Sequence, residues 1–288
     1  MSGGTDGVVV WADGRLRDPA APLLSPLDHG LTVGDGVFET CGVVRGHAYA
    51  LTRHLRRLRR SAEGIGLAAP DEDLIRAGVA AVLGAGSGLG RVRITVTAGI
   101  GPLGSGRLGG PQTVLVMAGP ASPAETVRAV RAPWVRNERS PVAGLKTTSY
   151  AENAVALAWA QARGADEALL ANTVGQLCEG TATNVFVELG GEVLTPPLSS
   201  GCLGGITRDL VLEWAADAGL PVREAAAGEL AFTVLDEVTA GRAALGLTGS
   251  VRTVAPVVAL DGVPVGSGPL LARVRELYAE REARDLDP

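Results

Sequence analysis

Residues 179–186 read Glu-Gly-Thr-Ala-Thr-Asn-Val-Phe and residues 203–208 read Leu-Gly-Gly-Ile-Thr-Arg, and the predicted architecture is built around these two segments. Short apolar runs bounded by turn residues predict strands at residues 184–188 and 192–194. A helix is predicted over residues 207–218, directly after the two glycines. The first N–H groups of a helix have no partner within it, and such helix ends bind phosphate. This stretch therefore predicts a mixed fold of strands and helices with an anion site at one helix end.

Upstream of that stretch, residues 144–150 read Gly-Leu-Lys-Thr-Thr-Ser-Tyr and contain Lys146, the only lysine among the 288 residues. Arginine supplies every other cationic side chain except the histidines. A lysine amine in a desolvated pocket can lose its proton and attack a carbonyl to form a Schiff base, whereas arginine stays protonated. The other interpretation is an ordinary surface lysine. The residue type alone leaves both open.

The composition is that of a folded globular chain with a small ligand. Its 288 residues, 46% of them hydrophobic, suit one large domain or two of ordinary size. It has no apolar run of about 18 residues, and residues 1–6 lack signal-peptide features, so we expect a cytoplasmic protein without membrane contact. The net charge of −5 and three scattered histidines argue against a nucleic-acid surface and a histidine metal site. Three cysteines without C-x-x-C spacing predict neither a disulfide framework nor a zinc site. Any cofactor is therefore expected to be organic.

Two prolines among small residues, at residues 120–124, predict a linker between domains, because such a run resists both helix and sheet. We expect a small N-terminal domain over residues 1–119, a linker at 120–125 and a larger domain over 126–288. In the first domain strands are predicted at residues 7–11, 37–44, 91–97 and 113–118, an Asp13-Gly14 turn follows the first, and helices span 51–62 and 71–83. In the second, further strands are predicted at residues 127–132, 167–171, 175–178, near 222, 237–239 and 253–260, and helices at 150–163 and 269–282.

A glycine-rich segment at residues 99–110 lies between two predicted strands. It lacks the Gly-Lys-Ser/Thr of a phosphate-binding loop, and a strand rather than a helix follows it, which excludes the dinucleotide pattern. We expect a mobile connection, with Arg107 as its only charged residue.

Residues 179–186, 193–195 and 203–208 together resemble the signature of the class IV aminotransferases, the fold-type IV enzymes that use pyridoxal 5'-phosphate. Residues 34–39 and 54–58 also resemble segments of this family, so the similarity extends from about residue 25 to residue 260. The resemblance implies an α/β (α+β) fold in two domains, the smaller one N-terminal. It also implies a homodimer with each active site near the interface.

The resemblance assigns roles to individual residues. Lys146 corresponds to the lysine that forms the Schiff base and then moves the Cα proton, and Glu179 to the carboxylate that holds the pyridine nitrogen. Tyr150 is a candidate partner for the phenolic oxygen, although its spacing from Lys146 is one residue shorter than in branched-chain aminotransferases. The phosphate ligands that the resemblance implies are Arg57, Ile206, Thr207 and Ser250. Four neighbouring arginines offer other registers for Arg57.

The expected substrate is inferred from motifs in which this sequence differs from the better-known branches of the family. The loop after residue 97 lacks the Arg-x-His of D-amino acid aminotransferases, and residues 147–150 replace the Gly-Asn-Tyr of branched-chain enzymes. Residues 143–146 and 165–168 look most like the aminodeoxychorismate lyase branch. Our first expectation is therefore a lyase that converts 4-amino-4-deoxychorismate to p-aminobenzoate and pyruvate. An aminotransferase for branched-chain or D-amino acids is the alternative, and a non-catalytic binding protein of the same fold is the third. The candidate substrate residues are Phe38, Arg107 and Arg252.

Overall fold

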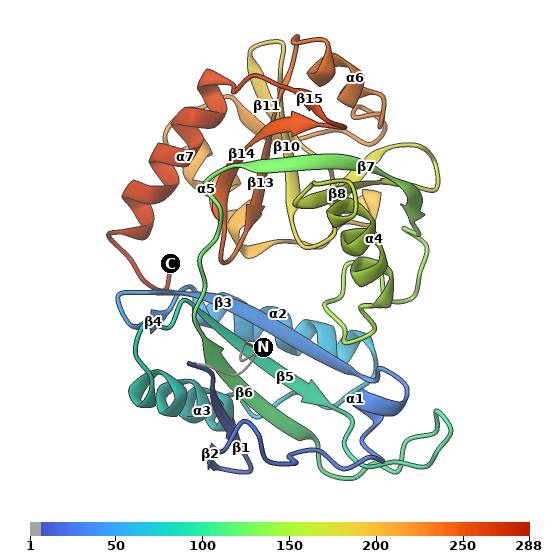
Figure 1. The fold of residues 1–288 in the computed structure, drawn as a ribbon, viewed down its shortest axis with the longest axis vertical. Helices are drawn as coiled ribbons and strands as arrows, with labels where there is room; N and C mark the ends of the chain where they lie inside the picture. The colour runs from blue at the N-terminus through green and yellow to red at the C-terminus, as the bar shows by residue number, and fades with distance from the viewer. Residues whose placement is uncertain (1–6) are drawn as a thin grey trace. The chain divides into compact units, whose positions relative to one another are not determined.

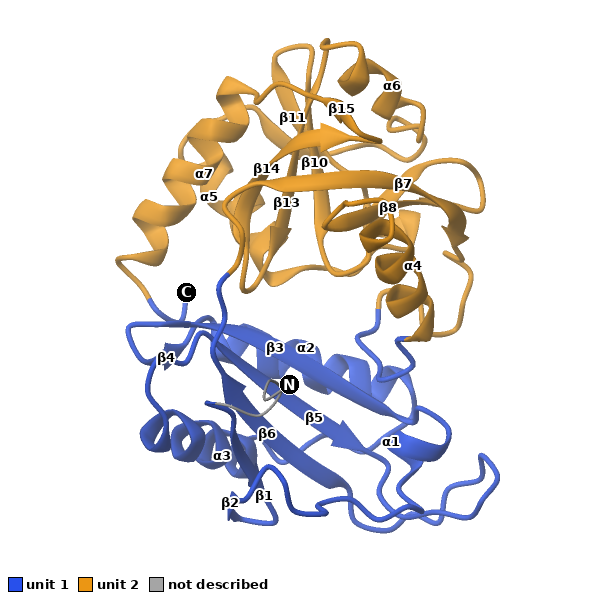
Figure 2. Cartoon of the chain, viewed as in Figure 1, with its two compact units in different colours: residues 1–122, 145–150, 286–288 blue, residues 123–144, 151–285 orange. Residues whose placement is uncertain are grey.

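The computed structural model describes residues 7–288, which form two compact units (Figure 2). Unit 1 contains the chain up to Ser122, together with Leu145–Tyr150 and Leu286–Pro288. Unit 2 contains Pro123–Gly144 and Ala151–Asp285. Residues 1–6, on which the expected absence of a signal peptide rests, lie outside the described residues. Within residues 7–288, no helix has both the length and the apolar character needed to cross a membrane.

Unit 1 is built on a six-stranded antiparallel sheet with the strand order β2-β1-β6-β5-β3-β4 (Figure 1). Its strands are β1 (Val9–Ala12), β2 (Arg15–Arg17), β3 (Gly36–Val44), β4 (His47–Ala48), β5 (Arg91–Thr97) and β6 (Thr113–Gly119), and its helices are α1 (His29–Thr32), α2 (Leu51–Gly64) and α3 (Glu72–Ala85). The predicted hairpin is confirmed, because Asp13 and Gly14 both have positive φ, at 52° and 78°, and join β1 to β2.

The core of unit 1 lies between α2, α3 and one face of this sheet. Alternate residues of β5, namely Val92, Ile94 and Val96, are fully buried in one cluster with apolar residues of both helices. Successive residues of a strand point to opposite faces, so Arg93 and Thr95 lie on the face away from the helices.

The helix α2 begins without a side-chain cap of its own, because Ala50 precedes it in a left-handed conformation and has no side-chain acceptor for the free N–H groups. Asp287 takes this role from the distant end of the chain. Its carboxylate accepts hydrogen bonds from the backbone N–H and the hydroxyl of Thr52 at 2.8 and 2.6 Å. A carboxylate at a helix N-terminus satisfies a free N–H and favours the helix dipole, so this contact stabilises the first turn of α2.

Unit 2 is built on a nine-stranded mixed sheet with the order β12-β11-β10-β13-β14-β7-β8-β9, and β15 pairs with β14. Its strands are β7 (Val127–Arg136), β8 (Glu167–Asn172), β9 (Leu177–Gly180), β10 (Asn184–Leu189), β11 (Glu192–Thr195), β12 (Val222–Glu224), β13 (Ala244–Gly249), β14 (Thr253–Leu260) and β15 (Val263–Pro264). Its helices are α4 (Ala151–Gln161), the 3-10 turn η1 (Leu198–Ser200), α5 (Ile206–Asp217), α6 (Val234–Thr239) and α7 (Pro269–Glu282). The pairs β7–β8, β7–β14 and β11–β12 are parallel. The predicted α/β class is therefore confirmed.

One predicted strand of unit 2 is wrong. Residues 237–239 form the end of helix α6. Val234, Leu235 and Val238 are all buried, and their spacing places them on one face of a helix. The short window 237–239 contains only one of these three residues, so the helical spacing is visible only when the segment is extended towards the N-terminus.

Candidate active site

The segment that carries Lys146 is bound to unit 1 through its backbone. The carbonyl of Lys146 accepts a hydrogen bond from the Phe38 N–H at 3.0 Å, and Thr147 forms a β-bridge with Val37. The N–H of Lys146 donates to the hydroxyl of Ser61 on α2 at 3.1 Å. A Cβ on Gly36 would lie 3.1 Å from Oγ1 of Thr148 and 2.8 Å from the carbonyl oxygen of Val96 on β5, so glycine allows both neighbours to approach β3 closely here. The segment is thus an extra edge partner of β3, anchored also to α2.

Two aromatic rings surround the amine of Lys146. Its Nζ lies 4.4 Å from the centroid of the Phe38 ring and 5.5 Å from that of Tyr150. The two rings meet edge to face, 5.1 Å apart with an interplanar angle of 84°. An amine on aromatic faces is held by cation–π attraction while charged and is partly shielded from water. This environment suits an amine that must act as a nucleophile or base.

Arg57 is the only buried arginine among the five on α2. Its Nε and Nη2 each donate to one oxygen of Glu39 at 2.7 Å. His54 donates from Nδ1 to Oε2 of the same carboxylate, also at 2.7 Å. The Arg57 guanidinium and His54 hold the pKa of Glu39 far below its usual range, although burial alone would raise it. Burial lowers the pKa of His54, so a neutral imidazole is present at neutral pH.

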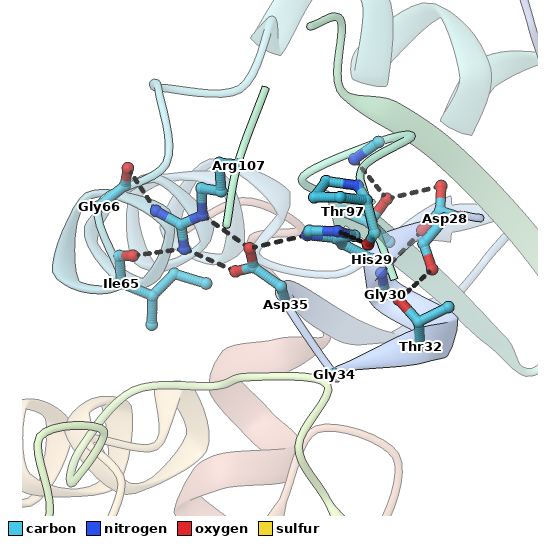
Figure 3. Close-up of polar contacts among 12 residues, drawn as sticks. Asp28, His29, Gly30, Thr32, Gly34, Asp35, Ile65, Gly66, Thr97 and Arg107 are labelled. Atoms are coloured by element: carbon cyan, nitrogen blue, oxygen red, sulfur yellow. Dashed lines mark hydrogen bonds and ion pairs between the residues drawn. The ribbon is translucent and has the colours of Figure 1, made fainter. Parts of the chain in front are cut away.

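Arg107 is engaged by other residues of unit 1 (Figure 3). Its Nε and Nη2 donate to the two oxygens of Asp35 at 2.7 and 2.6 Å. The remaining donors reach the carbonyls of Gly66 and Ile65, at the C-terminal end of α2, at 2.9 and 2.8 Å. Nearby, Nε2 of His29 lies 2.9 Å from the Pro102 carbonyl oxygen. The glycine-rich loop is therefore fastened to unit 1 through Arg107 and His29.

Arg93 is a functional candidate that sequence reasoning missed. Its guanidinium lies 3.8 Å from the centroid of the Phe38 ring and is half-buried, which lowers its pKa from the usual value. Among residues 7–288 no carboxylate pairs with it. The hydroxyl of Thr95, on the same face of β5, is also buried without a hydrogen-bond partner in the described chain. The alternation of β5 could have marked Arg93 as facing away from the core, but the sequence does not reveal its neighbour Phe38.

In unit 2, the carboxylate of Glu179, near the end of β9, is held in place by two contacts. Its Oε2 accepts the N–H of Leu203 at 3.0 Å, and its Oε1 lies 3.2 Å from Nε of Arg136. The contact with Arg136 is an ion pair without hydrogen-bond alignment, since that Nε lacks a hydrogen-bond partner in the described chain. Arg136 also donates to Asn153, which in turn donates to the Thr181 carbonyl. A carboxylate oriented in this way can hold a protonated ring nitrogen.

The N-terminus of α5 carries two of the predicted phosphate ligands. Gly205 precedes the helix without a side-chain cap, and Ile206 and Thr207 begin it. A Cβ on Gly205 would lie 1.9 Å from Oδ1 of Asn184, so glycine is required there. Asn184 pairs with Thr248, whose hydroxyl is buried and lacks a partner in the described chain. An uncapped helix end with a buried hydroxyl nearby fits a phosphate group.

The remaining predicted residues of unit 2 lie just beyond β13. Ser250 is half-buried, in the turn between β13 and β14. Arg252 is in the same turn, and its Nη1 is buried without a hydrogen-bond partner among residues 7–288.

Metal chemistry has no evident centre in the described part of the chain. Residues 7–288 contain no group of three or more His, Cys, Asp or Glu side chains placed to hold a metal ion. Cys41, Cys178 and Cys202 are free and buried, and burial raises the pKa of Cys202 to about 11. These thiols therefore stay protonated at neutral pH.

Comparisons with known proteins extend over both units. A family model described as amino-transferase class IV matches residues 36–260. The fold IV-transaminase CpuTA1 from Curtobacterium pusillum is 30% identical, with a TM-score of 0.81 over 96% of this chain and 99% of that chain. The branched-chain aminotransferase from Thermoproteus uzoniensis, solved with norvaline, is 31% identical, with a TM-score of 0.82 over 94% of this chain and 93% of its own. The aminodeoxychorismate lyase of Bacillus subtilis is 27% identical over 270 residues, 90% of this chain and 89% of the lyase.

Proposed function

Because this chain belongs to the class IV aminotransferase family, whose enzymes depend on pyridoxal 5'-phosphate, we propose that it exchanges an amino group between a small amino acid and a 2-oxo acid. When bound, the cofactor supplies an electron sink for the electron pair at the substrate Cα. Cofactor binding, proton transfer and recognition of the substrate carboxylate are assigned to residues of this chain.

The donor set of the chain fits this cofactor. The amine of Lys146 is the covalent partner for its aldehyde, and Glu179 is the carboxylate for its ring nitrogen. Arg57, the first N–H groups of α5 at Ile206 and Thr207, and the hydroxyl of Ser250 are assigned to the phosphate. Tyr150 is assigned to the phenolic oxygen. The fit is supported by the uncapped start of α5 and by the buried hydroxyl of Thr248, which has no hydrogen-bond partner within residues 7–288.

Lys146 is also assigned to proton transfer. Its amine accepts the proton from the substrate Cα and returns a proton in the second half of the exchange. Phe38 and Tyr150 flank this amine at 4.4 and 5.5 Å and partly shield it from water. Ser61 keeps the backbone of this residue in place through its hydroxyl.

The contrast between Arg107 and Arg93 carries the choice of reaction. The lyase expectation assigns Arg107 and Arg252 to a substrate with two carboxylates. Asp35 and two backbone carbonyls already occupy the donors of Arg107, so recruiting it would break a charged pair. Arg93 has no carboxylate partner in the described chain and lies beside Phe38, near the Lys146 amine. We therefore assign a substrate carboxylate to Arg93, and an amino acid provides one.

The lyase is the second candidate. Two observations favour it. The first is the similarity to the Bacillus subtilis lyase along nine-tenths of this chain. The second is Nη1 of Arg252, which has no hydrogen-bond partner among residues 7–288 and leaves a second cation for a dicarboxylate substrate. The homodimer and the cytoplasmic location that the sequence implies belong to either proposal.

A side-by-side assay tests this choice. The enzyme is incubated with 2-oxoglutarate or pyruvate and a panel of L- and D-amino acids, and separately with 4-amino-4-deoxychorismate generated in situ. Keto acid formation with no p-aminobenzoate supports the aminotransferase. Release of p-aminobenzoate and pyruvate at a kcat/KM above that of every amino acid would replace it with the lyase. A colourless protein that cannot bind pyridoxal 5'-phosphate would leave only the non-catalytic binding protein.

The role of Arg93 has its own test. Arg93→Gln should lower kcat/KM for amino acids by about 10²-fold, because a charge-assisted contact of roughly 3 kcal/mol is lost. A primary amine without a carboxylate is the control substrate and should lose little. An equal loss for both substrates would remove Arg93 from carboxylate recognition.

A further inference from the structure

Glu39 is a charged residue buried in the middle of β3, and the proposed reaction assigns it no role. Its side chain is fully inaccessible to solvent. Its two oxygens receive three hydrogen bonds, two from Arg57 and one from His54, each 2.7 Å long. Such bonds to a charged acceptor are about twice as strong as neutral ones, so the carboxylate holds both partners firmly.

Stability alone is a weak reason for this arrangement. Removing two charges from water costs several kcal/mol per ion, and apolar residues of similar volume often stabilise a core as well or better. What an apolar pair cannot do is fix the plane and direction of a guanidinium. With Nε and Nη2 of Arg57 bound to Glu39, the planar group is locked and Nη1 points away from the carboxylate.

His54 can bind the same carboxylate only as a hydrogen-bond donor. An ionised carboxylate accepts and never donates, so Nδ1 of His54 must carry the proton of the shared hydrogen bond. Burial keeps this imidazole neutral by lowering its pKa. The proton is therefore fixed on Nδ1, and Glu39 receives a third donor without a second full positive charge beside it.

One face of α2 joins this cluster to the Lys146 segment. His54, Arg57 and Ser61 are spaced by three and four residues, which places them on one side of the helix, and all three are buried. Ser61 binds the backbone N–H of Lys146. Phe38, which neighbours Glu39 on β3, binds the carbonyl of the same lysine. The direction of Arg57 and the position of Lys146 are therefore set by the same two elements.

We propose that Glu39 is a positioning residue, which aims the guanidinium of Arg57 at the cofactor phosphate, with His54 as a brace. The inference rests on the proposed function, because Arg57 is a phosphate ligand only there. Glu39 itself touches neither substrate nor cofactor and acts through Arg57.

Glutamine at position 39 has nearly the same shape but cannot accept the same three hydrogen bonds. Its amide offers one acceptor oxygen to three donors, and its NH₂ group would face another donor. The guanidinium of Arg57 must then rotate or lose a hydrogen bond to residue 39, so that it no longer points towards the phosphate.

The test compares two ligands of the cofactor-free protein, pyridoxal 5'-phosphate and pyridoxal, which lacks the phosphate. The ratio of their Kd values, measured by equilibrium dialysis, reports the phosphate contact alone and needs no turnover. Glu39→Gln should reduce the preference for the phosphorylated ligand about tenfold, with the affinity for pyridoxal nearly unchanged. Glu72→Gln is the matched control. Glu72, on α3, pairs with Arg59, which is on α2 like Arg57 but is exposed, so this variant should leave the ratio unchanged.

Arg57→Gln separates the possible failures. A reduced ratio in Arg57→Gln with a wild-type ratio in Glu39→Gln would overturn the role of Glu39 while leaving the proposed function intact. An unchanged ratio in Arg57→Gln would remove Arg57 from the phosphate and overturn the inference at its premise. Equal weakening of both ligands in Glu39→Gln would mean a purely structural role and overturn it as well. If Glu39→Gln does not fold, Glu39→Asp keeps the charge, withdraws the oxygens from Arg57, and should reduce the ratio too.

Discussion

At the scale of single residues, Lys146 combines an unusual composition with an unusual environment. It is the only lysine in the sequence, and its amine lies against two aromatic rings. Amine-directed chemistry on this protein therefore has one side-chain target, apart from the N-terminal amine. This makes the proposed covalent role of Lys146 directly measurable.

Lys146→Ala should abolish turnover, because no other side-chain amine exists to take its place. Borohydride treatment of the wild-type protein with pyridoxal 5'-phosphate should attach the cofactor to the peptide that contains Lys146, as read by mass spectrometry. Lys146→Arg is the control, since it keeps the positive charge but has no nucleophilic amine. Attachment found only at the N-terminal amine would contradict the assignment.

Arginine is where the sequence is least informative at this scale. Arginine occurs at positions 57, 93 and 107 in three different environments. Arg57 is buried and hydrogen-bonded to Glu39, Arg93 lies on the ring of Phe38, and Arg107 is bound to Asp35. The partner that decides each role is distant in sequence. Sequence reasoning could therefore name Arg57 and Arg107 as candidates but overlooked Arg93 and the partners Glu39 and His54.

At the scale of elements, hydrophobic periodicity predicted most helices and strands of both units. Helix α2 is a clear case, because Leu51, Leu55, Leu58 and Ala62 recur at helical spacing. The predicted strands at residues 91–97 and 253–260 have the observed bounds. The failures are short elements. The strand β13 was not predicted, and the three-residue window at 237–239 was too short to reveal the helix α6.

The glycine-rich loop is attached partly through one ion pair, between Arg107 and Asp35. Arg107 is its only charged residue, and the exposed fractions of the paired side chains are 34% for Arg107 and 13% for Asp35. At the root of the loop, a Cβ on Gly101 would lie 2.1 Å from the His29 ring, so the root is closely packed. The tip is different, because built Cβ atoms on Gly104, Gly106 and Gly109 meet nothing within 4 Å.

Asp35→Asn should loosen this loop. A partly exposed ion pair contributes up to about 1 kcal/mol, so cleavage by trypsin after Arg107 should accelerate about fivefold. The rate is measured by mass spectrometry of the 107–108 cut. Glu72→Gln, which releases Arg59 from its exposed pair, serves as the control and should leave this cut unchanged. Equal cleavage of wild type and Asp35→Asn would mean that the pair does not restrain the loop.

At the scale of the whole molecule, long-range pairing decides which residues share a unit. Residues 145–150 follow the linker in sequence, yet they group with unit 1 because they pair with the edge of β3. The last residues, 286–288, also group with unit 1, where Asp287 caps α2. No local pattern in either segment indicates these partners. The resemblance to a family predicted the fold class, whereas these contacts required the structure.

The pH dependence of stability follows from the buried cluster of Glu39, His54 and Arg57. Both titratable groups have folded pKa values below their ordinary ones, which are 6.5 for His54 and 4.5 for Glu39. Well above pH 6.5, folded and unfolded states hold equal numbers of protons at these two groups. Below 6.5 the unfolded chain protonates His54 while the folded chain does not, and below 4.5 the same is true of Glu39. Stability must therefore fall with acidification, first through His54 and then through Glu39.

His54→Gln should remove the first of these two steps. In the wild type, one group with a lowered pKa reduces the free energy of unfolding by up to about 1.4 kcal/mol per pH unit below its unfolded pKa. Glutamine still donates a hydrogen bond to Glu39 but takes up no proton, so the curve of unfolding free energy should become flatter between pH 6.5 and 4.5. Urea unfolding at each pH from 8 to 4 measures this slope. The matched control is His47→Gln, since His47 is exposed and its ring Nδ1 lies 3.0 Å from the Arg45 carbonyl oxygen, and it should keep the wild-type slope. If His54→Gln and His47→Gln give the same slope, His54 is not held neutral in the folded protein, and a second positive charge lies beside Glu39 at acidic pH.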